Sequence, residues 1–216
     1  MIPFRRASSR LAVVALLLTG LAGAAALGAT PAAAAAAPAA GGWVGRTGLI
    51  FSPEASSALL THSITITPQE PAAGSQMAPD KLLYALPVSK VVFDGDRVAE
   101  NVAKVNHYGS LVLSHGDGYT LRTIILDNIR ANFRKGRIIA DVYAGEASKG
   151  SGSLEELGRM TIFDIRMKKD PSSLGKSYAL FVGKKLAPAV ERHLGWFPAA
   201  GSRVGSGDTT VEPLPR

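Results

Sequence analysis

The sequence predicts a mainly β domain, an antiparallel two-sheet sandwich-like fold with two short helices, placed after an N-terminal signal peptide. Short segments with a two-residue hydrophobic period follow one another from Leu82 to Met167, and glycine-containing turns separate them. Hydrophobic residues make up 46% of the 216 residues, which is enough to build a core. The chain has no cysteine, so a disulfide scaffold, a thiolate zinc site and a cysteine nucleophile are excluded.

The first forty residues have the order of an export signal. Met1–Arg10 carries three arginines and no acid, Leu11–Leu27 is apolar, and Ala32–Ala40 is almost pure alanine. We therefore expect a signal peptide and Ala-rich cleavage region at 1–40, the β domain at 41–213, and a flexible end at 214–216. A retained anchor is the open alternative to cleavage, and after cleavage no membrane span is expected.

The charge of the mature chain argues against nucleic acid as a partner. Removing three arginines from the 24 Lys and Arg, against 17 Asp and Glu, lowers the net charge from +7 to +4. The lysine doublets of the mature chain, Lys168-Lys169 and Lys184-Lys185, are typical of solvated surfaces.

Two segments carry helix signals. Ser52-Pro53-Glu54 combines a capping hydroxyl, a proline suited to the first turn and an acid that complements the helix dipole. Ala187-Pro188 opens the second helix, with Val190 facing inward and Gly195 as its C-terminal stop.

The strands follow in order. The run Val102–Leu113 alternates around a kink at Gly109, with Val105 and His107 on one face before it. Arg134-Lys135-Gly136 is the turn of a hairpin between two alternating runs. We expect Glu146–Glu156 to be a loop. Gly201–Arg216 is predicted to be mobile, with a short edge strand at Thr209–Val211.

Four segments together resemble the HtaA-like domain of secreted actinobacterial proteins: Leu86-Pro87-Val88, Asn106-His107-Tyr108-Gly109-Ser110-Leu111, the hairpin arm Gly136–Val142, and Leu157–Ile165. The resemblance covers roughly Leu49 to Pro213 and implies a two-sheeted β fold with short helices.

The better-known members of that family bind haem and pass it along a surface uptake route. The resemblance implies an iron-ligating tyrosine near the start of the domain, supported by the histidine of the His-x-Gly motif, onto which His107 maps. This sequence departs from the pattern, because no tyrosine lies between Trp43 and Leu83. Phe51 is the only aromatic residue at 48–53, where the ligand should lie, and a phenyl ring supplies no oxygen to iron.

His107 and Tyr108 are therefore the candidate ligand-binding residues. Adjacent strand residues point to opposite faces, so both reach one ligand only if a bulge near Gly109 turns one of them. The alternative is a histidine satisfied by a backbone carbonyl inside the sheet, with Tyr108 packed on the other face. We expect no metal site and no catalytic residue, because paired-histidine motifs, nucleophile elbows and phosphate loops are missing from the sequence.

These observations predict a secreted or cell-surface protein that is not an enzyme. Our first hypothesis is an interaction or structural module of the envelope that has no cofactor and contacts a cell-envelope component or surface protein. The alternative is a binding module for haem or a similar flat apolar ligand. A third hypothesis is a hydrolase with no recognisable motif, assembled from scattered carboxylates or Ser and His residues.

Overall fold

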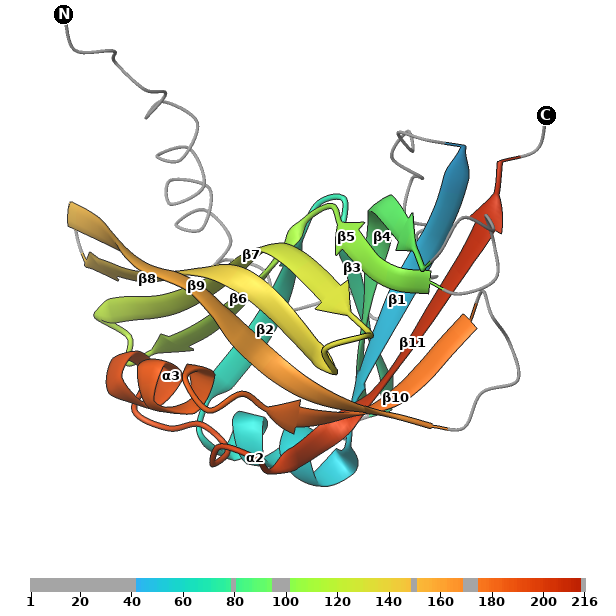
Figure 1. Cartoon of the computed structure of the whole chain (residues 1–216). Coiled ribbons are helices and arrows are strands. Elements are labelled where there is room, and N and C mark those ends of the chain that lie inside the picture. The colour runs from blue at the N-terminus through green and yellow to red at the C-terminus, as the bar shows by residue number, and fades with distance from the viewer. Residues whose placement is uncertain (1–41, 79–80, 95–101, 149–150, 169–174, 215–216) are drawn as a thin grey trace, which may run out of the picture.

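The computed structural model describes residues 42–78, 81–94, 102–148, 151–168 and 175–214 (Figure 1). The signal peptide predicted for 1–40 lies outside these residues, and of the predicted flexible end at 214–216 only Leu214 is described. The strands of the described chain are β1 (Trp43–Phe51), β2 (Ile64–Gln69), β3 (Ala73–Ala78), β4 (Lys81–Phe93), β5 (Val102–His107), β6 (Ser110–Gly116), β7 (Thr120–Asn132), β8 (Arg137–Ser148), β9 (Ser151–Met167), β10 (Gly175–Val182) and β11 (Arg203–Pro213). The helices are α2 (Pro53–Thr61) and α3 (Leu186–Leu194).

Eight of these strands close into a barrel. They pair in the order β7, β5, β4, β1, β11, β10, β9 and β8, and a β7–β8 pairing completes the ring. All the pairs are antiparallel. The predicted mainly β class, antiparallel pairing and two short helices are confirmed. The strands form one closed sheet where two stacked sheets were expected, because a two-residue period shows that one face of a strand is buried but not which strands share that core.

Three further strands extend the barrel wall. The first half of β7 pairs with β6, its second half pairs with β5, and β6 in turn pairs with β2. The third strand, β3, pairs with β4. The change of partner falls at a bulge between Asp127 and Arg130, where Asn128 has a φ of 51°. Asparagine tolerates this left-handed conformation better than most residues. Gly109, with a φ of 79°, lets the chain pass from β5 to β6, and a Cβ there would overlap Ala72.

Both helices lie along the same side of the barrel (Figure 1). The N-cap Ser52 accepts a hydrogen bond from the N–H of Ala55 at 3.3 Å, and α3 ends at Gly195, which has a φ of 86°. These are the predicted start and stop signals. α2 packs against β2, β4 and β11, and α3 packs against β7 and β9. Neither helix in the described part of the chain has the length and apolar character needed to cross a membrane.

Two expectations were wrong. The segment 146–156, expected to be a loop, continues β8 to Ser148 and begins β9 at Ser151, so the β8–β9 ladder extends well beyond the hydrophobic alternation. The C-terminal segment, expected to be mobile with a short edge strand, forms the eleven-residue β11 in the barrel wall between β1 and β10. Gly205 and Gly207 look like loop residues, but here they leave room for neighbouring strands and side chains.

Candidate functional site

His107, the principal candidate from the sequence, lies inside the barrel. Its side chain is buried, and Val105 on the same face of β5 is buried as well. The ring nitrogen Nδ1 lies 3.0 Å from the carbonyl oxygen of Ile129 on β7, and Nε2 lies 2.7 Å from the hydroxyl of Thr47 on β1. Both ring nitrogens of His107 are therefore engaged within the protein.

The hydrogen bonds continue across the barrel. The Thr47 and Thr209 hydroxyls lie 2.7 Å apart, and the Tyr178 hydroxyl lies 3.1 Å from that of Thr209. Thr47, Thr209 and Tyr178 are fully buried. They come from the adjacent strands β1, β11 and β10, so the barrel wall brings together residues that are far apart in sequence.

The carbonyl at one end of this chain and the neutral form of His107 together fix the direction of the hydrogen bonds. The Ile129 oxygen can only accept, so Nδ1 of His107 carries a proton, and in the neutral ring that burial favours, Nε2 accepts from Thr47. Thr47 then accepts from Thr209, which accepts from Tyr178. This arrangement requires a neutral imidazole at His107.

Burial also favours the neutral forms of the two ionisable members. Loss of solvation lowers the pKa of His107 to about 4, while the bond to Ile129 opposes that shift. Burial raises the pKa of Tyr178, and its hydrogen bond to Thr209 acts in the other direction. The chain is thus a neutral polar network in which each hydroxyl has a partner.

Tyr108, the second candidate, follows directly after β5 and is half-buried, and its N–H donates to the carbonyl oxygen of Pro87 at 2.9 Å. The hydrogen-bond chain from Nε2 of His107 runs through Thr47 rather than through Tyr108. The ligand-binding role of Tyr108 stays a prediction.

The remaining histidines connect surface elements. The ring of His62, at the end of α2, stacks on Trp196 with 4.1 Å between centroids and 9° between planes. His115 places Nδ1 3.1 Å from the carbonyl oxygen of His62, which ties β6 to α2. Among the described residues, no three His, Asp or Glu side chains gather in a way that suits a metal ion.

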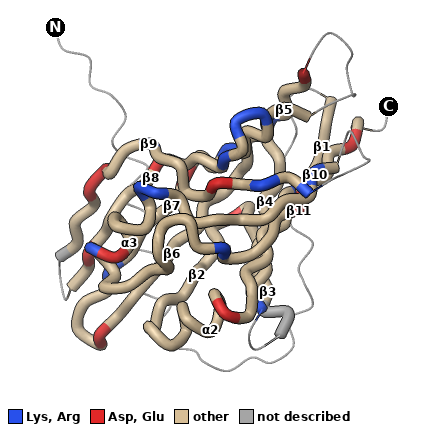
Figure 2. Tube along the Cα trace, turned by 60° about the horizontal axis from the view of Figure 1, so that its bottom comes forward, with Lys and Arg blue, Asp and Glu red and all other residues tan. Residues whose placement is uncertain are grey.

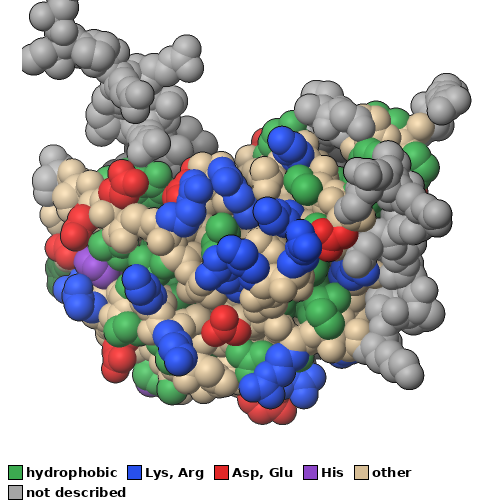
Figure 3. All heavy atoms as spheres, viewed as in Figure 1, with side chains coloured by type: hydrophobic (Ala, Val, Ile, Leu, Met, Phe, Trp, Pro, Cys, Tyr) green, Lys and Arg blue, Asp and Glu red, His purple; other side chains and the backbone are tan. Residues whose placement is uncertain are grey.

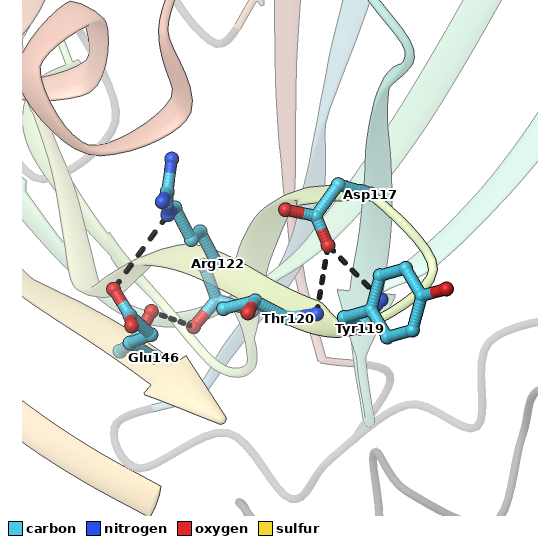
Figure 4. Close-up of polar contacts among 7 residues, drawn as sticks. Asp117, Tyr119, Thr120, Arg122 and Glu146 are labelled. Atoms are coloured by element: carbon cyan, nitrogen blue, oxygen red, sulfur yellow. Dashed lines mark hydrogen bonds and ion pairs between the residues drawn. The ribbon is translucent and has the colours of Figure 1, made fainter. Parts of the chain in front are cut away.

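The tip of the β6–β7 hairpin carries an exposed aromatic ring. Asp117 Oδ1 accepts hydrogen bonds from the N–H groups of Tyr119 and Thr120 at 3.0 and 2.8 Å, which holds the turn (Figure 4). These two N–H groups, that of Thr120 first, hold the pKa of Asp117 below its usual range. Tyr119 is 83% exposed, and the Arg122–Glu146 ion pair lies farther along the same ladder (Figure 4). The turn is accounted for by its own hydrogen bonds.

An open pocket of about 430 Å³ lies at the start of α2. It overlaps the segment 48–53, where the family resemblance would place an iron ligand. Its lining residues are Ile50, Phe51, Ser52, Pro53, Glu54, Lys81, Arg203, Gly205 and Ser206. This set offers two cations, one carboxylate and hydroxyls, but no imidazole, phenol, thioether or thiolate. It does not fit a ligated haem, whose iron takes an axial ligand of one of those types.

The outer wall of the barrel is rich in basic side chains. Positions that alternate with buried residues carry one Lys or Arg on each of five neighbouring strands. We call this set the basic face: Lys90 on β4, Lys104 on β5, Arg130 on β7, Arg137 on β8 and Arg166 on β9. Lys and Arg gather over the face formed by β5, β7, β8 and β9, with few acidic side chains among them (Figure 3). They come from separate strands rather than from one basic run (Figure 2).

Comparison with solved structures defines the class to which this fold belongs. The C-terminal domain of HtaA from Corynebacterium glutamicum has a similar fold, with a TM-score of 0.50, 17% sequence identity, and coverage of 78% of this chain and 99% of that domain. A domain-swapped dimer of a histidine-to-alanine variant of the same domain has a TM-score of 0.46 at 17% identity, over 88% of this chain and 100% of that one. The described barrel is therefore an HtaA-like domain in its fold. No protein-family model and no curated protein matches the chain.

Proposed function

We propose that this protein is an exported interaction module of the cell envelope, that it has no catalytic role, and that it works through its outer surface. The observation that carries the proposal is the bond between His107 Nε2 and the Thr47 hydroxyl, at 2.7 Å inside the barrel. In the family that the sequence resembles, the motif histidine supports a tyrosine that ligates haem iron. In this chain, the side chain near the start of the domain that takes this role as partner of His107 is a threonine, Thr47.

A threonine hydroxyl does not replace a phenol as a ligand. It ionises far less readily than a tyrosine, and here it is already committed to both His107 and Thr209. The chemistry of the candidate residues thus supports a structural role for His107 within the core.

The location of the protein gives the first test. Cells producing the tagged chain are fractionated after cross-linking, and the chain is followed with an antibody. We expect a shortened chain that stays with the envelope fraction and forms cross-linked adducts. A chain that keeps Met1 inside the cell, or a freely soluble exported monomer without adducts, would contradict the proposal.

One observation favours a second function, the binding of haem without an axial ligand from the pocket, or of a similar flat apolar ligand. The pocket at the start of α2 has a volume in the range of small-molecule sites, and Lys81 and Arg203 line it with cations that suit carboxylate groups. Mixing the purified chain with hemin and recording the Soret band tests this candidate. A shifted band that Lys81→Gln and Arg203→Gln together abolish would establish it in place of the first proposal.

A further inference from the structure

We propose that the basic face binds a flexible polymer that carries phosphodiester groups, outside the cytosol. The inference rests on the proposed function, because it names the surface and the partner chemistry of the envelope module. Its basis is the arrangement of Lys90, Lys104, Arg130, Arg137 and Arg166 on five consecutive strands of the barrel wall.

The strand registers order these cations into a zigzag. Lys90 lies opposite Asn106, and Lys104 lies opposite Asn132, so the two lysines are diagonal neighbours across β4 and β5. Arg130 pairs with Ile139 and Arg137 pairs with Asn132 across β7 and β8. The basic residues therefore advance by one diagonal step from strand to strand, and each diagonal step spans about 7–8 Å.

The zigzag continues onto β9. Arg137 lies opposite Asp164, and Arg166 is two residues farther along that strand. Strands are about 4.8 Å apart, so five of them give a band about 19 Å wide. The two asparagines between the basic residues, Asn106 and Asn132, supply uncharged N–H donors on the same outward side.

Most of the positive charge of this face is not paired within the described chain. None of the five forms an ion pair with an Asp or Glu of the residues that the structure describes. The neighbouring carboxylates Asp94 and Asp141 are bound by Arg134 and Arg159, at 3.0 and 2.7 Å. Asp164 lies opposite Arg137, and Asp141, although bound by Arg159, also interacts electrostatically with Arg130.

Arg166 is held in place before any ligand binds. Its guanidinium carbon stacks over the ring of Phe181, 4.4 Å from the centroid. A guanidinium group fixed in this way loses little side-chain freedom on binding and matches the paired oxygens of a phosphodiester. The Nε of Arg137 is buried and finds no acceptor among the described residues.

The curvature of the wall selects the class of partner. The outer surface of a closed barrel is convex, so a flat bilayer or a stiff duplex touches only part of a band that crosses five strands. A flexible chain follows the curve and meets each cation in turn. Repeated anionic groups along such a chain displace counterions, which makes the affinity depend steeply on salt.

The test compares two variants with the same change in charge. Lys104→Gln with Arg166→Gln alters two exposed members of the basic face, and Lys184→Gln with Lys185→Gln alters an exposed doublet before α3. Binding of the purified chain to poly(glycerol phosphate) is measured by calorimetry at several salt concentrations. A neutral dextran, polyglutamate, anionic vesicles and duplex DNA serve as comparison probes.

We expect the unaltered chain to bind poly(glycerol phosphate) and not dextran, with an affinity that falls as salt rises. If flexible phosphodiester chains behave like single-stranded nucleic acid, the basic-face variant loses roughly tenfold in affinity. The slope of log affinity against log salt concentration becomes shallower by about 1.4, because two cations are lost. The doublet variant should bind like the unaltered chain.

Equal losses in the two variants would overturn the inference, as would tighter binding to polyglutamate, vesicles or duplex DNA. Fractionation of cells producing the basic-face variant separates the two proposals. If that variant still cross-links to the envelope, the envelope module stands and the basic face is not its binding surface. If the unaltered chain does not reach the envelope, the proposed function fails regardless of the polymer measurements.

Discussion

His107 and Thr47 are sixty residues apart in the sequence and share a 2.7 Å hydrogen bond between Nε2 and Oγ1 inside the barrel. This bond is the first of three that link β5, β1, β11 and β10. Polar contacts thus join four strands inside a core that is otherwise mainly apolar.

Replacing Thr47 with valine should destabilise the fold. The substitution keeps the shape but leaves the Thr209 hydroxyl and His107 Nε2 without their shared partner in a buried site. We expect a loss of about 1–3 kcal/mol in the free energy of unfolding, measured with urea. Thr65→Val, at an exposed strand position, is the matched control and should change the free energy by less than about 0.5 kcal/mol.

Stability should fall with pH over a window set by His107. The pKa of its imidazole is about 4 in the folded protein, against 6.5 for an unperturbed histidine. Between these values the unfolded chain binds the proton and the folded chain does not, so stability is lost as the pH drops from 6.5 towards 4. The full effect is about 3 kcal/mol. The free energy of unfolding is measured with urea between pH 7 and pH 5, where most carboxylates are ionised in both states and contribute little. In a His107→Gln variant this free energy should depend less on pH.

Gly207 should not tolerate a side chain. A Cβ at this position of β11 would overlap the ring of Tyr178, which packs directly on the glycine. We expect Gly207→Ala to cost about 1–3 kcal/mol and to lower the thermal midpoint. Gly116→Ala is the control, since a Cβ there meets its nearest neighbour only at 3.7 Å. An unchanged midpoint for Gly207→Ala would show that the Tyr178 ring can move aside.

Hemin should not find an axial ligand at His107. Both ring nitrogens are bonded within the core, and the histidine is buried. The Soret band of hemin mixed with the purified chain should match that of free hemin, and His107→Ala should leave the spectrum unchanged. A shifted band that disappears only in His107→Ala would place haem inside the barrel and contradict this interpretation.

Local signals in the sequence were sufficient for the short elements. Ser52 and Pro53 mark the start of α2, and Gly195 marks the end of α3, because caps and glycine stops act within one turn of a helix. Gly136, with a φ of 60°, forms the expected turn between β7 and β8. Each of these features depends on residues that are close in the chain.

The partners of His107 could not be predicted in the same way. Thr47, Thr209 and Tyr178 lie on other strands, and only the order of strands around the barrel brings them to the histidine. The sequence does carry a weaker signal. Each of these polar residues lies at a position of its strand that alternates in step with the buried apolar residues. The basic face was missed for a related reason. Its cations are isolated in the sequence, and only the strand registers gather them.

The pairing of β1 with β11 has a mechanical consequence. Trp43 lies opposite Pro213 and Phe51 lies opposite Gly205, so the first and last strands enter and leave at the same rim of the wall. A force pulling these two ends apart therefore opens the ladder like a zip, one pair at a time, rather than shearing every bond at once. Under tension the domain would begin to open along this seam, far below the load that a sheared ladder of equal length could carry.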